Sequence, residues 1–459
     1  MALNQQQLGE IKWALGALAG QLRGYSRAEL FASYARYYAG DHPLLFATPK
    51  FLETFGHTFK AHVENLCRVP LDIQTDLLQV EGFAVRGGED AASDANEIWR
   101  RNRMDERAGQ VHKNTGLFSE SFVIAWPDSE SGEAVIYPNL PGNVVVKYHA
   151  ERLGYIIEAA KFWTQDDGFG YLTHYTPETI TRYRTKNKAN TGTMAVAGAF
   201  DLYETDATPA IVGNEFGKVP VFRFVNNAGV GGVGESEIHD LRGPQDALNK
   251  AKADMLLAAE YTAYPQKYAL GYEIKKDPVT QEAINPFKSG PDRMWAIKDP
   301  AATIGQLPAA DLKPFLDMMN DARMSIARIS GTPPHYFGMD TGGWPSGESL
   351  KTASERLIRK VIDRQISFGN TWSDVMRFCL QIEGKADIEL STLWNDPTPR
   401  ASESEAIAAA IAKQGLGVPT GVVLQELGYS PEQATEWAAA LEGDGFPDLS
   451  AGGGGDTQS

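Results

Sequence analysis

The chain of 459 residues contains only two cysteines, Cys67 and Cys379, which lie far apart. Their positions match no spacing of zinc ligands, which disfavours a zinc ribbon and a disulfide framework. We expect two buried, reduced thiols, because free cysteine is among the most buried residue types. The sequence also lacks any run of about eighteen apolar residues, so we expect no membrane-spanning helix and assembly in a cytoplasm.

Basic residues are outnumbered as well. The 43 Lys and Arg residues oppose 59 Asp and Glu residues, for a formal net charge of −16 at pH 7. Proteins that grip nucleic acid cluster Lys and Arg against the phosphates. The charge therefore argues against tight binding of nucleic acid, although it is compatible with a conduit through which DNA passes loosely held.

Motifs for catalysis, metals and cofactors are missing too. The sequence contains no HExxH, GxxxxGK[ST] or GxSxG pattern, and its eight histidines never stand three or four residues apart. Residues 229–234 spell GxGxxG after a strand and before a helix, but no second parallel strand follows, since Asp254 lies inside a helical pattern. We interpret this glycine segment as a flexible hinge, with a nucleotide site as the minor alternative, and expect no cofactor.

The composition that is present is that of a globular protein. Hydrophobic residues make up 42% of the chain and charged residues 22%. A chain of this length exceeds what one core usually supports, so two or more packed regions are expected. Only the last residues, 450–459, rich in Gly, Ser and Asp, are predicted to be disordered.

The hydrophobic period changes along the chain. Residues 4–39, 51–66 and 91–115 have apolar residues three and four apart, which predicts helices. From Ser119 the period becomes two, which predicts an antiparallel β region with a mobile loop at 186–199. The predicted strands are 120–126, 134–137, 143–148, 154–163, 170–175, 179–184 and 219–225.

Helical periodicity returns in the second half. Residues 244–264 and 311–329 predict two helices separated by a short mixed region with strand-like pieces at 267–274 and 293–297. A glycine-rich loop, 338–347, then precedes the strongest helical pattern, 348–383, which would be roughly 50 Å long and bent at Gly369. Ala-rich helices are predicted at 401–414 and 430–442, with a short helix at 419–428.

Basic side chains gather once, on the first half of this long helix. They are Lys351, Arg356, Arg359, Lys360 and Arg364. One interpretation is a solvated helix face with some ion pairs. The other is a ring of weak phosphate contacts or a salt-bridged seam between subunits.

The order of these elements resembles that of tailed-phage portal proteins, particularly those of siphophages that infect actinobacteria. The resemblance extends to about residue 400. It is carried by ordered short segments, among them Tyr37–Pro43, Ile98–Asn102, Gln245–Lys250, Thr332–Phe337 and Pro345–Lys351.

The resemblance implies an α+β portal-protein fold, mainly helical, with an inserted antiparallel β region, two stem helices, a small α/β clip and one very long spine helix. Its implied parts are a wing at 1–235, stem helices at 236–264 and 309–330, a clip at 265–308, a tunnel loop at 331–348, the spine and its return to the wing at 349–399, a crown at 400–445 and a disordered tail at 446–459. The implied tunnel-loop residues are Gly338, Gly342, Gly343, Trp344, Ser346 and Gly347.

The resemblance also implies a function without enzymatic activity. The family forms rings of about twelve subunits at one capsid vertex of the virion, which serve genome packaging, head-tail connection and DNA ejection. Implied partners are double-stranded DNA, weakly bound, the terminase large subunit, the major capsid and scaffolding proteins, and the head-tail connector protein, with no membrane.

Two other functions remain open from the sequence. The acidity, the tryptophans and the β region suggest a carbohydrate-active or other hydrolytic enzyme, although no carboxylate pair can be placed about 5 to 10 Å apart. Another capsid-associated structural protein would also lack catalytic motifs, but it would not predict the order of helix, small region, helix and long helix.

Overall fold

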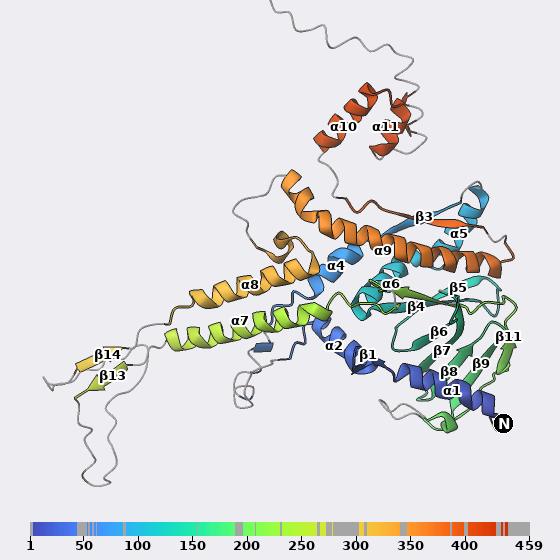
Figure 1. Ribbon diagram of the computed structural model, residues 1–459, viewed down its shortest axis with the longest axis horizontal. Helices are drawn as coiled ribbons and strands as arrows, with labels where there is room; N and C mark the ends of the chain where they lie inside the picture. The colour runs from blue at the N-terminus through green and yellow to red at the C-terminus, as the bar shows by residue number, and fades with distance from the viewer. Residues whose placement is uncertain are drawn as a thin grey trace, which may run out of the picture. The chain divides into compact units, whose positions relative to one another are not determined.

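A computed structural model describes the chain in segments separated by gaps (Figure 1). The described residues are 3–43, 53, 56, 59–60, 62–85, 89–152, 154–188, 196–206, 208–229, 232–263, 267–271, 278, 303–306, 310–339, 347–385, 388–398, 403–427, 433–434 and 437–438. The chain divides into a larger unit, residues 1–344 and 353–397, and a smaller unit, residues 345–352 and 398–459.

The N-terminal third of the larger unit is mostly helical, as predicted, but its elements are shorter. In order they are α1 (Gln5–Leu18), β1 (Gln21–Leu22), β2 (Tyr25–Ser26), α2 (Arg27–Ala39), α4 (Arg68–Asp76), β3 (Val80–Val85), α5 (Glu89–Arg101) and α6 (Met104–Phe118). The helical stretch predicted at 4–39 is confirmed as two helices, separated where Arg23 and Gly24 adopt positive φ and close a small hairpin between α1 and α2.

The helix predicted at 91–115 is likewise two helices, because Arg103 has a φ of 52° and breaks the backbone between α5 and α6. Cys67 precedes α4, and Cys379 lies on the long helix described below. Both cysteines are free and buried, as predicted, and burial raises the pKa of the Cys67 thiol to about 12. Of the helix predicted at 51–66, the described residues 53, 56, 59 and 60 are helical, whereas 62–66 are not, so the predicted end is too late; the other residues of this segment lie outside the described part.

The predicted antiparallel β region is confirmed. One sheet has the order β10-β9-β8-β7-β6, with β11 also pairing β9, and a second has the order β12-β4-β5. The bounds are β4 (Glu120–Pro127), β5 (Ala134–Asn139), β6 (Val144–Tyr148), β7 (Ile156–Thr164), β8 (Gly170–Tyr175), β9 (Thr179–Thr185), β10 (Phe200–Leu202), β11 (Ile211–Gly213) and β12 (Val221–Val225). A short 3-10 helix, η1 (Ala197–Ala199), precedes β10; part of the predicted loop 186–199 lies outside the described residues.

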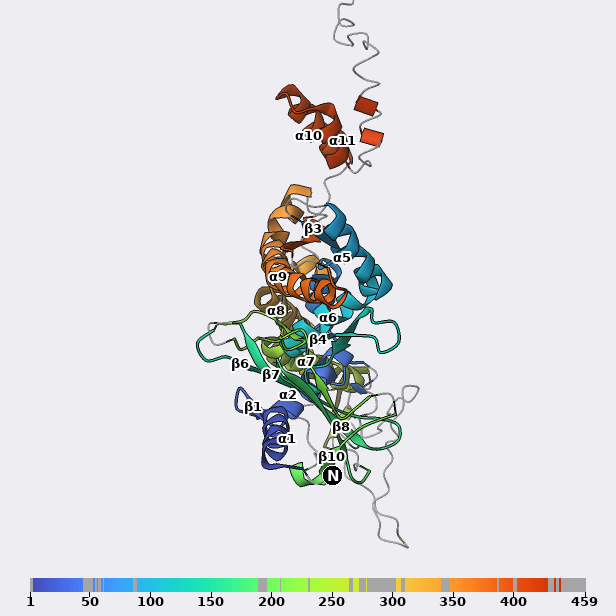
Figure 2. The same ribbon diagram turned by 90° about the vertical axis from the view of Figure 1, so that its right-hand side faces the viewer.

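The alternation of side chains explains how the larger sheet is covered. Alternate residues of β7, β8 and β9, such as Ala160, Leu172 and Tyr183, pack against Ile11 and Leu15 of α1. Figure 2 shows α1 beside this sheet. The period of two thus gives the sheet one face that is buried beneath a helix.

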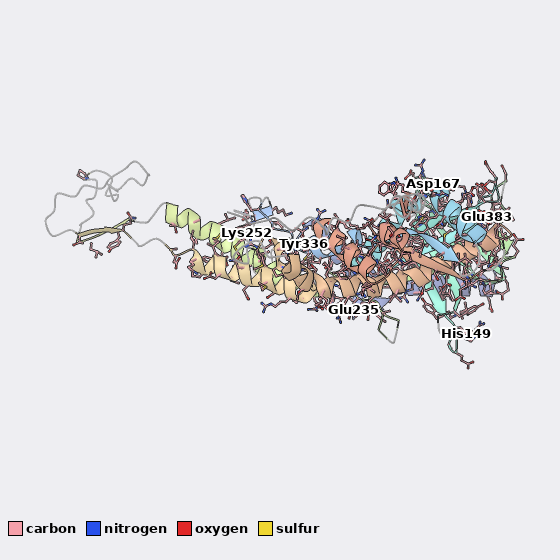
Figure 3. The ribbon with its side chains drawn as sticks, turned by 90° about the horizontal axis from the view of Figure 1, so that it is seen from above. His149, Asp167, Glu235, Lys252, Tyr336 and Glu383 are labelled. Carbon is pink, nitrogen blue, oxygen red and sulfur yellow. The ribbon has the colours of Figure 1, made fainter. Side chains whose placement is uncertain are left out.

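Two antiparallel helices follow the β region: α7 (Arg242–Ala263), after the 3-10 turn η2 (His239–Leu241), and α8 (Lys313–Ser330). They lie side by side in Figures 1 and 3, where Lys252 marks α7. Their contact is formed by small and apolar residues, among them Leu248, Ala251, Met319, Ala322 and Ile326. Both predicted helices are confirmed to within a few residues.

The region between α7 and α8 is described only in part. The antiparallel strands β13 (Lys267–Leu270) and β14 (Thr303–Gln306) pair there. Thus the strand predicted at 267–274 is found in its first half. The strand predicted at 293–297 lies outside the described residues.

After α8 come the 3-10 turn η3 (Pro334–Phe337), the 36-residue helix α9 (Gly347–Ile382) and the strand β15 (Leu390–Trp394), which pairs antiparallel with β3. Trp372 of α9 is fully buried against Trp99 and Phe224, with ring centroids 5.0 and 4.6 Å away. These aromatic contacts are the centre of the largest core, so the predicted long helix is a principal wall of the larger unit. The strands β3 and β15 were not predicted.

In the smaller unit the structure describes α10 (Glu403–Gly415) and α11 (Thr420–Glu426), close to the helices predicted at 401–414 and 419–428. Of the helix predicted at 430–442, four residues are described, and the predicted tail lies outside the described residues. The mixed α+β class predicted from the sequence is confirmed.

Candidate functional site

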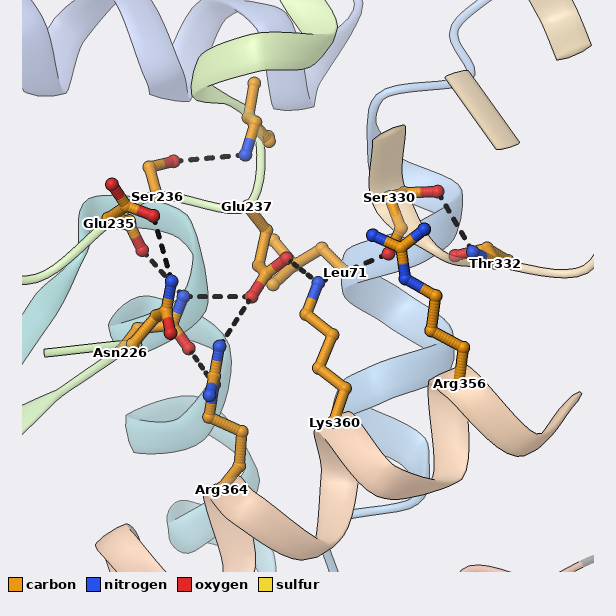
Figure 4. Close-up of polar contacts among 12 residues, drawn as sticks. Leu71, Asn226, Glu235, Ser236, Glu237, Ser330, Thr332, Arg356, Lys360 and Arg364 are labelled. Atoms are coloured by element: carbon orange, nitrogen blue, oxygen red, sulfur yellow. Dashed lines mark hydrogen bonds and ion pairs between the residues drawn. The ribbon is translucent and has the colours of Figure 1, made fainter. Parts of the chain in front are cut away.

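A buried carboxylate lies where the link before α7 meets α8 and α9. Glu237 has a side chain only 7% exposed, and it accepts hydrogen bonds from Lys360 Nζ and, at 2.9 Å, from Asn226 Nδ2. The oxygen that accepts from Asn226, Oε1, also lies 3.5 Å from Arg364 Nη2 (Figure 4). We call Asn226, Glu237, Lys360 and Arg364 the ionic junction.

The second cation of the junction is also internal. The Arg364 side chain is 4% exposed, and its Nε donates to Asn226 Oδ1 at 2.5 Å, while its Nη1 donates to Asp363 Oδ2 at 2.8 Å. Burial alone would raise the pKa of the Glu237 carboxyl, but Lys360, Asn226 and Arg364 outweigh it and hold that pKa below its usual range. The junction therefore keeps Glu237 ionised in the interior.

Basic residues of α9 also cap the end of α8. Lys360 Nζ donates to the carbonyl of Ser330 at 3.3 Å, and Arg356 Nη1 donates to that of Arg328 at 3.0 Å. The last carbonyls of a helix have no partners within it and carry its negative dipole end. Gly331, with a φ of 71°, ends α8 directly beneath the Arg356 side chain. The cations thus attach the end of α8 to α9.

Backbone contacts fix the link that carries Glu237. The amide of Glu237 donates to the Gly116 carbonyl at 2.9 Å, and Ser236 Oγ donates to the Leu117 carbonyl at 2.6 Å. A side chain at Gly234 would lie 2.2 Å from the Ser119 carbonyl oxygen, so only glycine fits there. The glycine segment 229–234 therefore ends in a close approach to the end of α6, after a strand, β12, that is antiparallel to β4.

The structure separates the five basic residues predicted as one cluster. Lys360 and Arg364 face the ionic junction, whereas Arg359 is 77% exposed and pairs with Glu355 of the same helix. Arg356, which contacts the end of α8, is exposed. The side chain of Lys351 lies outside the described part. The solvated-face interpretation fits Arg359, and contact with DNA or with a neighbouring subunit stays a prediction.

The predicted tunnel-loop residues are described only at the two ends. Gly338 has a φ of 67° and ends η3, and Gly347 is the first residue of α9. Gly342, Gly343, Trp344 and Ser346 lie outside the described residues.

No metal-binding cluster appears among the residues that the structure describes. A search of them for three or more His, Cys, Asp or Glu side chains able to hold one metal ion finds none. The same described residues contain no helix with the length and apolarity needed to cross a bilayer. What the geometry offers is a rigid attachment of a helix pair to a long helix.

Comparison with known proteins decides the family. Residues 28–444 match the family described as phage portal protein, SPP1 Gp6-like. The chain belongs to this portal protein family.

Two curated relatives agree. The portal protein of Mycobacterium phage L5 is 26% identical over 410 residues, and that of Mycobacterium phage D29 is 26% identical over 412 residues. Each alignment covers 84% of this chain and 81% of the relative. Among solved structures, a chain from the neck of a native gene transfer agent particle, computed with C12 symmetry, has a TM-score of 0.48 and 13% identity over 92% of this chain and 98% of that chain.

As a member of the portal protein family, this chain is a structural component of the virion and not an enzyme. Family membership implies a homo-oligomeric ring. The alternatives of a hydrolytic enzyme and of another capsid-associated protein are therefore replaced by the portal assignment.

Sequence reasoning missed several residues of the portal chain that connect distant segments. Glu237 is one, and Glu120 is another: it pairs with Arg27 at 2.8 Å and with Arg223 at 2.6 Å. His112 also connects distant segments, through a hydrogen bond from Trp372. The partners are about 90 to 260 residues apart in sequence, so no local spacing announces them.

Proposed function

We propose that the portal chain assembles into a closed ring of about twelve copies around a channel at one capsid vertex. Double-stranded DNA would enter the head through this channel during packaging and leave through it during ejection. The match of residues 28–444 to the portal family supports the proposal.

The parts implied by the sequence give each element a place in such a ring. In this proposal 1–235 is the wing, 236–264 and 309–330 are the stem, 265–308 is the clip, 331–348 is the tunnel loop, 349–399 is the spine with its return, and 400–445 is the crown. The 22 residues of α7 would span roughly 33 Å. A helix pair of that length suits a passage through a capsid opening.

The single observation that carries the mechanism is the ionic junction. Through Glu237, Lys360 and Arg364, it attaches two helix ends to α9: the N-terminal end of α7 and the C-terminal end of α8. A second carboxylate, Glu64, grips Arg323 of α8 at 2.9 Å and Lys252 of α7 at 3.4 Å. The helix pair would therefore hold a fixed angle against the spine while DNA moves past it.

The proposed partners follow from the same assignment. They are the terminase large subunit during packaging, the major capsid and scaffolding proteins during assembly, and the head-tail connector protein afterwards. DNA would be held weakly, because a charge of −16 per chain is repeated around the ring.

The tunnel loop provides the test of a moving wall. Glycines 342 and 343 give the backbone freedom, so we predict that the double variant Gly342→Pro, Gly343→Val forms normal rings but packages much less DNA. Ring formation is measured by negative-stain microscopy, and DNA-filled heads are counted after complementation of a phage that lacks its portal protein.

The matched control is Gly142→Ala, because Gly142 has no atom within 4 Å of an added Cβ and its φ is not positive. Normal packaging by the double variant would contradict a moving loop. The ring itself would be contradicted if the purified protein sedimented strictly as a monomer and purified procapsids also contained the chain only as a monomer.

A further inference from the structure

A cavity of about 300 Å³ lies between the sheet of β6–β10 and the β4–β5 hairpin. Seven of its thirteen lining residues are aromatic: Trp126, Tyr137, Trp163, Tyr171, Tyr175, Tyr183 and Tyr203. The indole of Trp163 and the ring of Tyr171 stack with centroids 5.6 Å apart. We call this space the aromatic cavity.

Strand register explains why these residues meet. Lys161, Thr173 and Arg182 are direct neighbours across β7, β8 and β9, and Trp163 stands opposite Tyr171 one step along. Side chains on alternate positions point to opposite faces, so this row lies on the face opposite to α1. Farther along the same face, Tyr175 and its neighbours are covered by β4 and β12. The aromatic cavity is the part of that face that the described elements leave uncovered.

Two cations line the cavity without a carboxylate. Lys161 Nζ lies 5.0 Å from the centre of the Trp163 ring, and its only described polar contact is this cation–π contact. Burial lowers the pKa of Lys161, and no charged neighbour offsets it. Arg182 likewise forms no ion pair within the described residues. Arg184 does not line the cavity; its guanidinium lies over the rings of Phe169 and of Tyr203, which does.

These walls select a ligand by charge and shape. Aromatic rings accept flat or apolar groups, whereas two unpaired cations reject a cationic ligand and attract carboxylates. The volume is at the lower end of the range for ligand pockets, so it fits one or two side chains but not a DNA duplex.

We propose that the aromatic cavity binds an acidic peptide segment of a partner protein, with an apolar side chain between the rings and carboxylates on Lys161 and Arg182. Charge complementarity selects this occupant, since the two cations have no counter-ion among the residues that the structure describes. The proposal is independent of DNA passage through the ring.

The test uses the assembled protein and fluorescent peptides, measured by anisotropy. The probes are acetyl-Glu-Phe-Asp-amide, its neutral counterpart acetyl-Gln-Phe-Asn-amide, and a short DNA duplex. We expect the acidic peptide to bind and the other two probes to bind at least roughly ten-fold more weakly. Lys161→Met and Arg182→Gln should each lower the affinity for the acidic peptide by about ten-fold, and Lys161→Arg should keep that affinity.

The control variant is Lys186→Met, which removes the same charge from an exposed residue next to β9 that does not line the cavity. Four outcomes would each overturn the proposal. The neutral peptide could bind as well as the acidic one, the acidic peptide could bind Lys161→Met unchanged, the duplex could bind best, or none of the probes could bind. Trp163→Phe keeps a ring in the wall and is expected to bind the acidic peptide, so it separates loss of the cavity from loss of charge.

Discussion

The ionic junction and the aromatic cavity treat the same kind of side chain in opposite ways. At the junction, Lys360 and Arg364 share the buried carboxylate of Glu237. At the cavity, Lys161 and Arg182 are partly buried without any carboxylate in the described chain. A cation that pairs with a carboxylate of its own chain stabilises the fold. A cation without such a partner indicates that another molecule supplies the carboxylate.

The energetic meaning of the two places differs as well. A buried ion pair adds little net stability over an apolar core, yet removing one partner leaves the other charge desolvated. An unpaired cation near a surface carries a smaller cost, because water still reaches it. Substitutions in the two regions should therefore change the free energy of unfolding by different amounts and in opposite directions.

The largest effect is expected from Glu237→Gln, which keeps the shape of the side chain and removes its charge. Because the half-buried Lys360 and the buried Arg364 would lose the carboxylate that they share, and Arg364 would be left with the exposed Asp363, we expect the free energy of unfolding to fall by about 3 to 5 kcal/mol. Urea unfolding followed by tryptophan fluorescence measures the loss.

Glu355→Gln is the matched control, because Glu355 is 59% exposed and pairs with Arg359 on the surface. It should change the free energy of unfolding by less than about 0.5 kcal/mol. A similar small change for Glu237→Gln would show that the junction is not an internal ion pair. Adding Lys360→Met to Glu237→Gln should recover part of the loss.

The next largest effect is expected on the pH dependence of stability. It arises at His112, a buried side chain that stays neutral in the folded protein, unlike the buried ionised carboxylate of Glu237. His112 donates from Nδ1 to the Leu78 carbonyl at 3.0 Å and accepts from Trp372 Nε1 at 2.8 Å. Burial lowers the pKa of His112 to about 4, against about 6.5 when unfolded. The unfolded chain therefore binds the extra proton first, and stability falls by up to about 3 kcal/mol as the pH drops from about 6.5 to 4.

Measured between pH 7 and 5, thermal unfolding of His112→Gln should depend less on pH than that of the natural chain. His42 and His239, whose pKa values burial also lowers, remain in both proteins and cancel in the comparison. His149→Gln, at a partly exposed histidine, serves as control. Identical pH slopes for the natural chain and His112→Gln would contradict a neutral, buried imidazole.

The smallest effect tests the cavity directly. Lys161→Met removes a partly buried charge that has no carboxylate partner, so we expect the unbound protein to become more stable, by about 0.5 kcal/mol. Differential scanning calorimetry measures the shift, with Lys186→Met as reference. Destabilisation by more than about 1 kcal/mol would show that an ion pair inside the chain satisfies Lys161.

Local patterns predicted the elements whose partners are close in sequence. The strands β4 to β9 follow one another with short turns, and α7, α8 and α9 carry long apolar stripes, so their periods were visible. The pair β3 and β15 was missed because each strand is short and its partner lies about 300 residues away. The hairpin between α1 and α2 was missed, although Gly24 is a residue typical of turns. The helical periodicity on both sides of it was the stronger pattern.

The same limit applies to the sites. Arg356, Lys360 and Arg364 stand four residues apart, which places them on one helix face, whereas Arg359 faces elsewhere. The sequence therefore showed a basic stripe but not that Glu237 lies beneath it. In the aromatic cavity, the alternation of β7 to β9 predicted which residues share a face, but only strand pairing brought Lys161 next to Arg182.

The pairing of β3 with β15 has a consequence for synthesis. Leu390 pairs with Val85, so the strand that completes the largest core leaves the ribosome about 300 residues after its partner. At translation rates of about 5 to 20 residues per second, that interval is roughly 15 to 60 s. Throughout it, Phe83 and Trp99 lack the contacts that α9 and β15 later supply. The largest core of a nascent chain thus stays incomplete until residues 390–394 have been translated.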